Sequence, residues 1–322
     1  MTAELPSIAV LGAGAFGTAL ALAYDRAGHA TTLWSYRADH ADILDKTRQN
    51  PRLPSIDLPT SLQVTSRLPP HADLILLACP TQSLSTLLTA HEQTLNGTPL
   101  IACCKGIDLT TGDGPTALIA RHCPASIAAI LTGPSFAAEV ARGLPTGLTL
   151  ACAAPSAQQL QTDLSTPTLR LYRTPDTTGA ELGGALKNVI AIACGAAIGA
   201  GYGESARASI LTRGFAEMTR LATTLGADPA TLTGLSGLGD LTLTAMSEQS
   251  RNTRFGLALG RGEPFPPNVT VEGKATAIAA RTLADKHSLD LPVLRTTAAL
   301  ASGQLTPTQM ADQLLARPLK EE

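Results

Sequence analysis

Residues 7–40 read SIAVLGAGAFGTALALAYDRAGHATTLWSYRADH. A short apolar run is followed by Gly12, Gly14 and Gly17, and then by an alanine-rich segment with helical spacing. In this setting Gly12 permits a tight turn, Gly14 lets the backbone approach a pyrophosphate, and Gly17 lets helix and strand pack closely. The N-terminus of the helix adds free N–H groups and a positive dipole end. The stretch predicts a dinucleotide site, the alternative being glycines that serve only a strand-to-helix turn.

Strand-like runs recur through the first half of the chain. Short apolar runs are separated by segments of helix length: SIAVLG, ATTLWS, ADLILLAC, PLIACC, SIAAILTG and TGLTLAC. Continuous apolar runs suit a parallel sheet that is covered on both faces. From about Thr177 onward the periodicity is helical. We therefore expect an α/β Rossmann domain at residues 1–178, doubly wound around a mostly parallel sheet, and an all-α domain at residues 179–322.

The composition argues against several classes of function. The 322 residues carry a net charge of -2, with no basic stripe and only 3% aromatic residues, which argues against nucleic acid as a partner. The six cysteines show neither CxxC pairs nor zinc-ligand spacing, so we expect reduced thiols and no metal site. The first residues lack the pattern of a signal peptide or an organellar leader, which favours a cytoplasmic location.

One apolar segment, residues 182–201, has the length of a membrane span. It contains five glycines and a central Lys187-Asn188 pair. The lysine alone costs about 2.5–3.5 kcal/mol at mid-bilayer, and the glycines weaken the helix. The sequence therefore predicts no membrane span here, but a buried core helix.

The end of the second predicted strand bears on the choice of cofactor. The chain reads Trp34-Ser35-Tyr36-Arg37 there, and no acidic residue precedes Asp39. An NAD-specific site usually places Asp or Glu against the ribose hydroxyls, whereas an arginine pairs with the 2′-phosphate of NADP or stacks on adenine. The sequence favours NADP, or acceptance of both NADP and NAD. A solvated loop arginine is the alternative.

Three loops follow later predicted strands, around Pro80, Lys105 and Ser135. Ligands of open parallel sheets bind outside the carboxyl ends of the strands, so these loops are expected to meet the cofactor. Lys105 follows a buried run, precedes a glycine, and is one of only six lysines, which makes it a candidate ligand contact. The turn GPSFAAEV offers helix N–H groups and the Ser135 hydroxyl.

The lysine inside the apolar segment needs an explanation. Four small residues and one isoleucine share the helical face of Lys187: Gly183, Gly184, Ile190, Ala191 and Cys194. They leave room for a ligand, and a lysine in an apolar setting is suited to proton transfer. Asn188 can orient a substrate hydroxyl or a cofactor amide. A snorkelling or ion-paired structural lysine is the alternative.

The remaining polar candidates lie in GLSGLGDLTLTAMSEQSRNTRFG, residues 234–256. Asp240 follows a glycine-rich turn, and Thr244 comes one helical turn later. Beyond them lie Ser250, Arg251 and Asn252. An aspartate near the lysine would orient its ammonium, and an arginine is suited to gripping a phosphate or carboxylate. A solvated loop of ordinary charges is the alternative.

The second half of the chain contains a single histidine, His287, in the polar run DKHSLD. A solvated turn or a helix end is the expected setting for that run. A histidine–aspartate acid/base pair therefore has no good candidate, and lysine is favoured as the proton donor.

Seven motifs occur in order between about residues 7 and 275: GAGAFGTALA, CCKGI, LTGPSFAAEVARGLPT, ELGGALKNVIAIACG, LTRGFAEMTRL, GLSGLGDLTLT and QSRNTRFG. Together they resemble the successive motifs of the bacterial NAD(P)-dependent sn-glycerol-3-phosphate dehydrogenase family. The resemblance implies an N-terminal Rossmann domain that carries NAD(P) and a helical C-terminal domain that completes the site.

The resemblance also implies residue roles. Lys187 matches the family's catalytic lysine. Substrate contacts are matched by Lys105, Asp240, Ser250, Arg251 and Asn252, with Gly133 and Ser135 beside them. Cofactor contacts are matched by Phe16, Ala137, Arg251 and Glu272. Two positions depart from the family pattern: Ala15 replaces a frequent serine, and Tyr36 stands where a basic residue is common, with Arg37 shifted by one.

The implied reaction is reversible hydride transfer between NAD(P)H and C2 of dihydroxyacetone phosphate, giving sn-glycerol 3-phosphate for membrane lipids. Lys187 would donate the proton with Asp240 as its anchor, Arg251 and Asn252 would hold the phosphate, and Lys105 and Thr244 would complete the polar cage. We expect a homodimer. Two alternatives remain open: a β-hydroxyacid dehydrogenase, which would more typically place an asparagine where Ala191 stands, and a dinucleotide-sensing protein.

Overall fold

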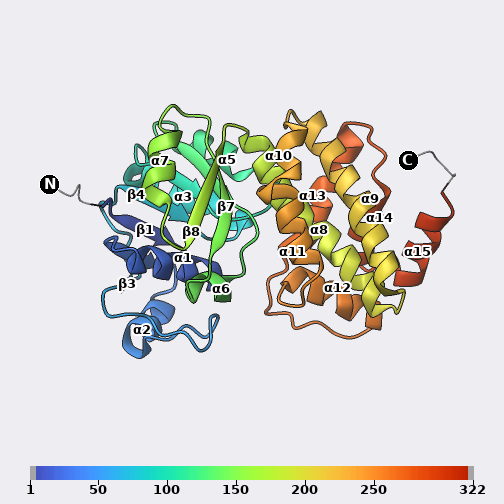
Figure 1. The fold of residues 1–322 in the computed structure, drawn as a ribbon, viewed down its shortest axis with the longest axis horizontal. Coiled ribbons are helices and arrows are strands. Elements are labelled where there is room, and N and C mark those ends of the chain that lie inside the picture. The colour runs from blue at the N-terminus through green and yellow to red at the C-terminus, as the bar shows by residue number, and fades with distance from the viewer. Residues whose placement is uncertain (1–4, 318–322) are drawn as a thin grey trace. The chain divides into compact units, whose positions relative to one another are not determined.

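The computed structural model describes residues 5–317 and divides the chain into two units (Figure 1). The first unit runs to Lys105 and resumes from Asp113 to Ala180. The second takes Gly106–Gly112 and the described residues from Glu181 onward. The short segment 106–112 therefore leaves the first unit and packs with the second, where Ile107 joins the hydrophobic core.

The first unit is built on one eight-stranded sheet with the order β3-β2-β1-β4-β5-β6-β7-β8. Its strands are β1 (Ile8–Leu11), β2 (Thr31–Trp34), β3 (Gln63–Thr65), β4 (Leu74–Leu77), β5 (Leu100–Ala102), β6 (Ala128–Thr132), β7 (Thr146–Ala151) and β8 (Leu169–Thr174). Every neighbouring pair is parallel except β6 and β7. The order reverses between β1 and β4, the usual place for a ligand in such sheets. The predicted Rossmann domain is confirmed.

Two strands, β3 and β8, are absent from the predicted set. Both lie at the edges of the sheet. β3 has three residues, none of them buried, and β8 alternates buried and exposed residues. An edge strand lacks the continuous apolar run that marks a central parallel strand, so the pattern used for the others does not find them.

Helices cover both faces of this sheet: α1 (Ala15–Arg26), α2 (Ala38–Thr47), α3 (Leu84–Ala90), α4 (Glu92–Leu95), α5 (Pro115–His122), α6 (Ala137–Ala141) and α7 (Ala157–Leu164), with a 3-10 turn at Thr81–Ser83. Alternate residues of β1 enter two separate cores. Ile8 and Val10 pack with α1 and α7, whereas Ala9 and Leu11 pack with α3 and α5. This is the burial on both faces that continuous apolar strands require.

The second unit is helical, and no strand occurs among its described residues. Its helices are α8 (Thr177–Gly199), α9 (Gly203–Thr224), α10 (Pro229–Thr233), α11 (Asp240–Ala245), α12 (Arg251–Arg261), α13 (Glu272–Lys286), α14 (Pro292–Ala301) and α15 (Pro307–Leu315), with a π-helical turn at Leu235–Gly239. α8 is long and apolar enough to cross a membrane, but 89% of its most apolar window is buried inside the protein. The predicted core helix is confirmed.

Glycines bring α8 and α12 into backbone contact. A Cβ atom on Gly195 of α8 would lie 2.2 Å from the Thr253 carbonyl oxygen, and one on Gly256 of α12 would lie 2.2 Å from the Ile192 carbonyl oxygen. Gly199 and Gly260 continue the same contact one turn further on. The helices that carry Lys187, Asn188, Arg251 and Asn252 are thus in contact through their backbones at these glycines.

One buried acid joins α9 to α14. The Glu217 carboxylate accepts hydrogen bonds from the Val293 N–H (2.9 Å) and the Leu294 N–H (3.0 Å). These N–H groups belong to the first turn of α14, where backbone donors lack partners within the helix. Burial raises the pKa of Glu217 to about 7, although both hydrogen bonds oppose the shift.

Candidate active site

The glycine turn leaves space for a dinucleotide's pyrophosphate. Gly12 has φ +127°, and a Cβ atom there would lie 2.7 Å from the Ala78 carbonyl group. A Cβ atom on Gly17 would lie 2.0 Å from the Gly12 carbonyl oxygen. A Cβ atom on Gly14, the N-cap of α1, would meet no heavy atom within 4 Å. Gly12 and Gly17 are required by close packing, and Gly14 leaves the helix N-terminus open. The turn therefore fits the expected pyrophosphate.

Ala15 and Phe16 form the first turn of α1 and pack partly against the core of the first unit. Neither side chain is charged, so the anion-binding character of this turn comes from backbone N–H groups and the helix dipole. This explains physically how alanine can stand at position 15, where a serine is frequent in the family the motifs resemble.

The segment after β2 carries a charged cluster that sequence reasoning identified only in part. Tyr36 is 84% exposed. Arg37 forms a two-pronged ion pair with Asp39: its Nε donates to Oδ1 at 3.1 Å and its Nη2 donates to Oδ2. The hydrogen-bonded pair raises the pKa of Arg37 and lowers the pKa of Asp39. Arg37, the predicted cofactor contact, is therefore already paired with the carboxylate of Asp39.

His40 and Arg52 stand beside this pair. The His40 Nδ1 lies 3.2 Å from the Ser35 Oγ. Burial, followed by the charges of Arg52 and Arg37, lowers the pKa of His40, whereas Asp39 and a hydrogen bond with Asn50 raise it. His40 of α2 and Arg52 from the segment after it thus belong to the same polar cluster as Arg37 and Asp39. Neither His40 nor Arg52 was a sequence candidate, because five and fifteen residues separate them from Ser35 and Arg37 with no motif to connect them.

Buried Asn50 ties this cluster to the glycine turn. Its Nδ2 donates to the Thr18 Oγ1 (2.7 Å) and to the Ala13 carbonyl oxygen (3.3 Å), while its Oδ1 accepts the Arg52 N–H (3.0 Å). Buried amides with all groups engaged hold their surroundings rigidly. The position of the Arg52 backbone is therefore set by the same turn that is shaped for a pyrophosphate.

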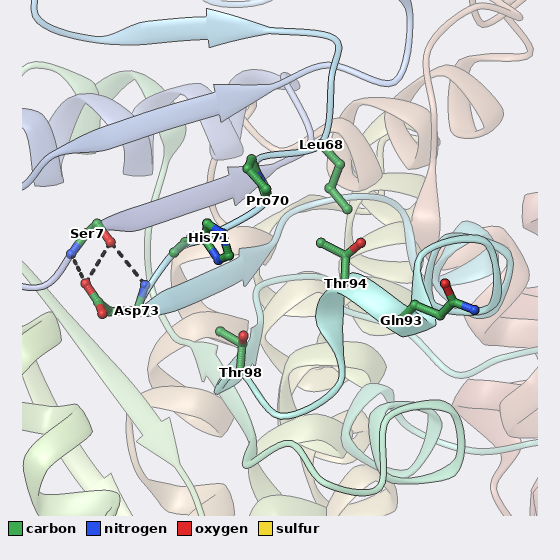
Figure 2. A pocket seen from close by; sticks show the side chains of 9 residues that line it. Ser7, Leu68, Pro70, His71, Asp73, Gln93, Thr94 and Thr98 are labelled. Carbon is green, nitrogen blue, oxygen red and sulfur yellow. Dashed lines mark hydrogen bonds between the residues drawn. The ribbon is translucent and has the colours of Figure 1, made fainter.

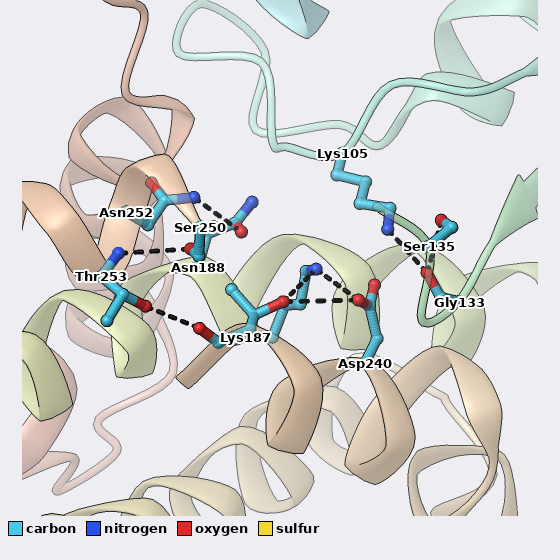
Figure 3. Close-up of polar contacts among 10 residues, drawn as sticks. Lys105, Gly133, Ser135, Lys187, Asn188, Asp240, Ser250, Asn252 and Thr253 are labelled. Carbon is cyan, nitrogen blue, oxygen red and sulfur yellow. Dashed lines mark hydrogen bonds and ion pairs between the residues drawn. The ribbon is translucent and has the colours of Figure 1, made fainter. Parts of the chain in front are cut away.

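Two further candidates meet at the carboxyl edge of the sheet. The Lys105 Nζ and the Ser135 Oγ both donate to the Gly133 carbonyl oxygen, each at 3.0 Å (Figure 3). Lys105 follows β5 and Gly133 follows β6, which are neighbouring parallel strands. Gly133 has φ +139°, a conformation that favours glycine. Ala137, a predicted cofactor contact, is the first residue of α6.

In the second unit, Lys187 lies in a buried polar cluster. Its Nζ donates to the Asp240 Oδ1 and, at 2.6 Å, to the Thr244 Oγ1. The Thr244 hydroxyl lies 3.4 Å from the same Asp240 oxygen. All three residues are less than a tenth exposed. The structure thus brings together the predicted lysine, aspartate and threonine, whose contact the sequence could not establish.

A second chain of hydrogen bonds runs beside the first. The Asn252 Nδ2 donates to the Asn188 Oδ1 at 2.9 Å, and the Asn252 Oδ1 accepts the Gly273 N–H at 3.0 Å. A Cβ atom on Gly273 would lie 2.8 Å from that same oxygen. These contacts connect α8, α12 and the start of α13, which begins at Glu272, a predicted cofactor contact. Gly273 was not a sequence candidate, since a single glycine after a polar residue carries no signal.

The first turn of α12 places Ser250 and Arg251. Ser250 is the N-cap, and its Oγ accepts the Thr253 N–H at 3.2 Å. The Thr253 hydroxyl in turn donates to the Thr244 carbonyl oxygen at 2.6 Å. Arg251 is the first residue of the helix and is exposed. Thr253 was missed by sequence reasoning, and its role is to hold the backbone of Thr244.

His287 lies at the C-terminal end of α13. This confirms the helix-end setting expected from the sequence.

The first unit also contains a cavity of about 640 Å³ at the opposite edge of the sheet (Figure 2). Its lining includes Ser7, His71, Asp73, Thr94 and Thr98. Ser7 and Asp73 directly precede β1 and β4, so the cavity lies at the amino ends of these strands. Asp73 is already bonded there by the Ser7 N–H (2.8 Å) and the Ser7 hydroxyl (2.7 Å). The cavity is therefore separate from the glycine turn at the carboxyl end of β1.

Comparison with known proteins identifies the family of this chain. Residues 7–158 match the family model described as NAD-dependent glycerol-3-phosphate dehydrogenase N-terminus, and residues 176–312 match the C-terminus of the same family. The chain is 58% identical over 318 residues to a glycerol-3-phosphate dehydrogenase [NAD(P)+] of Paracoccus denitrificans, covering 98% of this chain and all of that protein. It is 46% identical to the corresponding protein of Bradyrhizobium diazoefficiens, with 98% of each covered.

Solved structures give the same result. The crystal structure of glycerol-3-phosphate dehydrogenase from Coxiella burnetii matches with a TM-score of 0.93 and 35% identity, covering 98% of this chain and all of that one. D-mandelate dehydrogenase, at 15% identity and a TM-score of 0.66, shares the fold alone. With two family models spanning most of its length, this chain belongs to the NAD-dependent glycerol-3-phosphate dehydrogenase family and is an NAD(P)-dependent oxidoreductase.

Proposed function

We propose that this chain catalyses reversible hydride transfer between NAD(P)H and C2 of dihydroxyacetone phosphate, giving sn-glycerol 3-phosphate. The observation that carries the proposal is the buried cluster of Lys187, Asp240 and Thr244. A paired, hydrogen-bonded ammonium held below the surface is suited to meet an oxygen on which negative charge develops. The assignment of the substrate is supported by the similar proteins, which are named glycerol-3-phosphate dehydrogenases.

In this proposal Lys187 is the proton donor. When the carbonyl carbon gains hydride, its oxygen gains an electron pair, and the ammonium both stabilises that charge and supplies the proton. Asp240 orients the ammonium through its Oδ1 atom, and Thr244 holds it from a second side. In the reverse direction the neutral amine accepts the proton from the C2 hydroxyl while hydride leaves the carbon.

The phosphate of the substrate is assigned to Arg251 with Asn252. Arg251 is exposed in the first turn of α12, where a guanidinium and helix N–H groups act on the same anion. The side-chain amide of Asn252 is engaged by Asn188 and Gly273, so its part in the clamp is to place the turn, and Arg251 carries the charge. Ser250 and Lys105 are further substrate contacts in this proposal, with Gly133 and Ser135 beside Lys105.

The cofactor supplies or accepts the hydride through its nicotinamide ring. The residues assigned to its binding are Gly12, Gly14, Ala15, Phe16, Gly17, Tyr36, Arg37, Lys105, Ala137, Arg251 and Glu272. The open space around Gly14 at the N-terminus of α1 supports the first part of this set, because the backbone N–H groups of a helix N-terminus are suited to bind a pyrophosphate.

The first test is the initial rate of NADPH oxidation by purified protein with dihydroxyacetone phosphate, compared with NADH and with unphosphorylated dihydroxyacetone. Turnover that requires the phosphate supports both the reaction and the arginine clamp. Turnover on a β-hydroxyacid instead would assign the protein to a different substrate class. Cofactor binding without turnover on either substrate would contradict the proposed activity.

We further propose that the enzyme acts in the cytoplasm as a homodimer and supplies sn-glycerol 3-phosphate to glycerophospholipid synthesis. The helical unit exposes apolar side chains of Tyr202, Met246 and Ile278, which a second copy would cover. The molar mass from light scattering after size-exclusion chromatography tests the dimer. Deletion of the gene in its host should create a growth requirement for glycerol or glycerol phosphate, and unchanged growth of the deletion strain would contradict the lipid role.

A further inference from the structure

The charged cluster after β2 contains one residue whose effect runs against the others. Arg37 and Arg52 are cations and His40 is an imidazole whose pKa is lowered by burial and by their charges, whereas Asp39 is an acid that already binds Arg37 through both of its oxygens. Arg37 and Asp39 are both well exposed, with side-chain exposures of 64% and 61%. A ligand can therefore reach the pair without unfolding any part of the domain.

We propose that Asp39 sets the NADP/NAD preference of this chain, by acting as a resident counter-ion that the 2′-phosphate of NADP must displace from Arg37, while Arg52 and His40 complete the phosphate site. The inference rests on the proposed binding of NAD(P) at the glycine turn and goes beyond it, since it assigns specificity to residues that contribute nothing to the pyrophosphate.

The chemistry of the two anions supports the exchange. A guanidinium binds a carboxylate and a phosphate with the same pair of parallel N–H donors, so the two ligands compete for one geometry. The carboxylate is held at high local concentration because only one residue separates it from the arginine. A phosphate brings more negative charge, and it gains Arg52 and His40 as additional partners, which the Asp39 carboxylate does not need.

The backbone also supports this assignment. The Ser35 Oγ donates to the Arg37 carbonyl oxygen at 3.1 Å and lies next to the His40 Nδ1, so it holds the β2–α2 turn in shape. Asn50 fixes the Arg52 backbone to the glycine turn. The Arg52 backbone is therefore tied to the glycine turn and the Arg37 backbone to Ser35, and an NAD molecule, which lacks the 2′-phosphate, leaves the Arg37–Asp39 pair intact.

The chain provides its own reporter for the test. Trp34, its single tryptophan, ends β2, donates its Nε1 to the Ser66 carbonyl oxygen at 3.0 Å and lies against the Tyr36 ring at a centroid distance of 6.4 Å. Quenching of its fluorescence in the absence of substrate gives the dissociation constants of NADPH and NADH without turnover. The proteins to compare are the unchanged chain, Asp39→Asn, Arg52→Ala and the control Asp45→Asn, which removes an exposed acid of α2 that pairs with Arg48 instead.

Asp39→Asn is expected to tighten NADPH by at least about threefold and to change NADH by less than about twofold, as befits an exposed charge. Arg52→Ala is expected to weaken NADPH binding by a similar factor and to leave NADH binding unchanged. Asp45→Asn is expected to change neither dissociation constant. An unchanged NADPH/NADH ratio in Asp39→Asn overturns the inference while leaving the proposed function intact. Loss of NADH affinity in that variant also overturns it, because Asp39 would then bind the ribose hydroxyls. A chain that binds neither cofactor fails the proposed function itself.

Discussion

The Lys187 ammonium donates to the Thr244 hydroxyl across 2.6 Å, with Asp240 bonded to the same nitrogen. Lys187 is contributed by α8 and the other two residues by α11, so the ammonium is positioned by two helices. A surface lysine has none of this constraint and moves among many rotamers. The constraint gives the proposed proton transfer a defined geometry.

Replacing Lys187 by methionine is expected to lower kcat by about 10²–10⁴-fold, because the proton donor is lost while the volume is kept. Fluorescence titration of NADPH should show little change in binding. Lys274→Met serves as the control, since Lys274 is an exposed lysine of the same unit that lies over the Phe255 ring. A Lys187→Met enzyme with normal turnover would sink the assignment.

Arg251→Ala is expected to raise the KM for dihydroxyacetone phosphate by about 10- to 100-fold, the value of a charge-assisted hydrogen bond of about 1.5–3 kcal/mol. Steady-state kinetics with varied substrate at saturating NADPH measures it. Arg254→Ala is the matched control, because Arg254 is exposed one turn further along α12. Equal KM changes in the two variants would mean that α12 has no specific phosphate contact.

Asn252→Ala is expected to lower the free energy of unfolding by about 2–4 kcal/mol, because the Gly273 N–H and the Asn188 oxygen are left buried without this partner. Denaturant titration of Asn252→Ala, Asn188→Ala and the double variant forms a double-mutant cycle. The shared hydrogen bond should make the double variant less destabilised than the sum of the two. Strict additivity of the two losses in unfolding free energy would contradict the hydrogen bond between Asn252 and Asn188.

Gly195→Ala is expected to destabilise the protein by about 1–3 kcal/mol or more, because its Cβ would press against the backbone of α12. Gly214→Ala is the comparison: a Cβ atom on this helical glycine of α9 would lie 2.8 Å from the Cγ2 atom of buried Ile190, a side chain rather than a backbone atom. Thermal denaturation of both variants measures the difference. Equal losses in the two would show that the backbone contact between α8 and α12 has no special cost.

Glu217 gives the protein a pH-dependent stability. Its pKa is raised to about 7 in the folded chain, so the folded state binds the proton more tightly than the unfolded chain, in which the pKa is near the ordinary 4.5. The resulting stabilisation, up to about 3 kcal/mol, is present below about pH 4.5 and is lost as the pH rises through about 7. Relative to Glu217→Gln, the unchanged protein should therefore lose stability between about pH 5 and pH 8 in denaturant titrations. Parallel curves for the two proteins would contradict this.

Local patterns predict the parts of the fold that depend on local residues. The glycine turn, the central strands and the buried α8 each leave a continuous signature in a short stretch of sequence. The edge strands β3 and β8 leave none, because they are half exposed. Contacts between distant segments are also hidden: 53 residues separate Lys187 from Asp240, and nothing in the sequence between them states that they touch.

The same distinction applies to the charged cluster. Sequence reasoning selected Arg37 from its place after a strand, but its ion pair with Asp39 depends on side-chain rotamers at the start of α2. Arg52 joins the cluster only because Asn50 fixes its segment to the glycine turn. Gly273 acts through its backbone N–H, which every residue except proline possesses, and Thr253 acts through its hydroxyl on the Thr244 carbonyl oxygen, a contact that no local pattern marks.

The path of residues 106–112 has a topological consequence. Because this segment belongs to the second unit while its neighbours on both sides belong to the first, the chain passes between the units at 105/106, 112/113 and 180/181. A cut at 180/181 leaves residues 106–112 of the second unit on the same fragment as the first unit, and a cut at either of the other two points leaves at least one fragment with residues of both units. A fragment that ends near residue 178 would carry Ile107, which is 1% exposed in the whole protein, without the helices that cover it. Limited proteolysis is therefore a poor route to an isolated dinucleotide domain, whereas joining 105 to 113 through a short linker removes the shared segment and with it two of the three crossings.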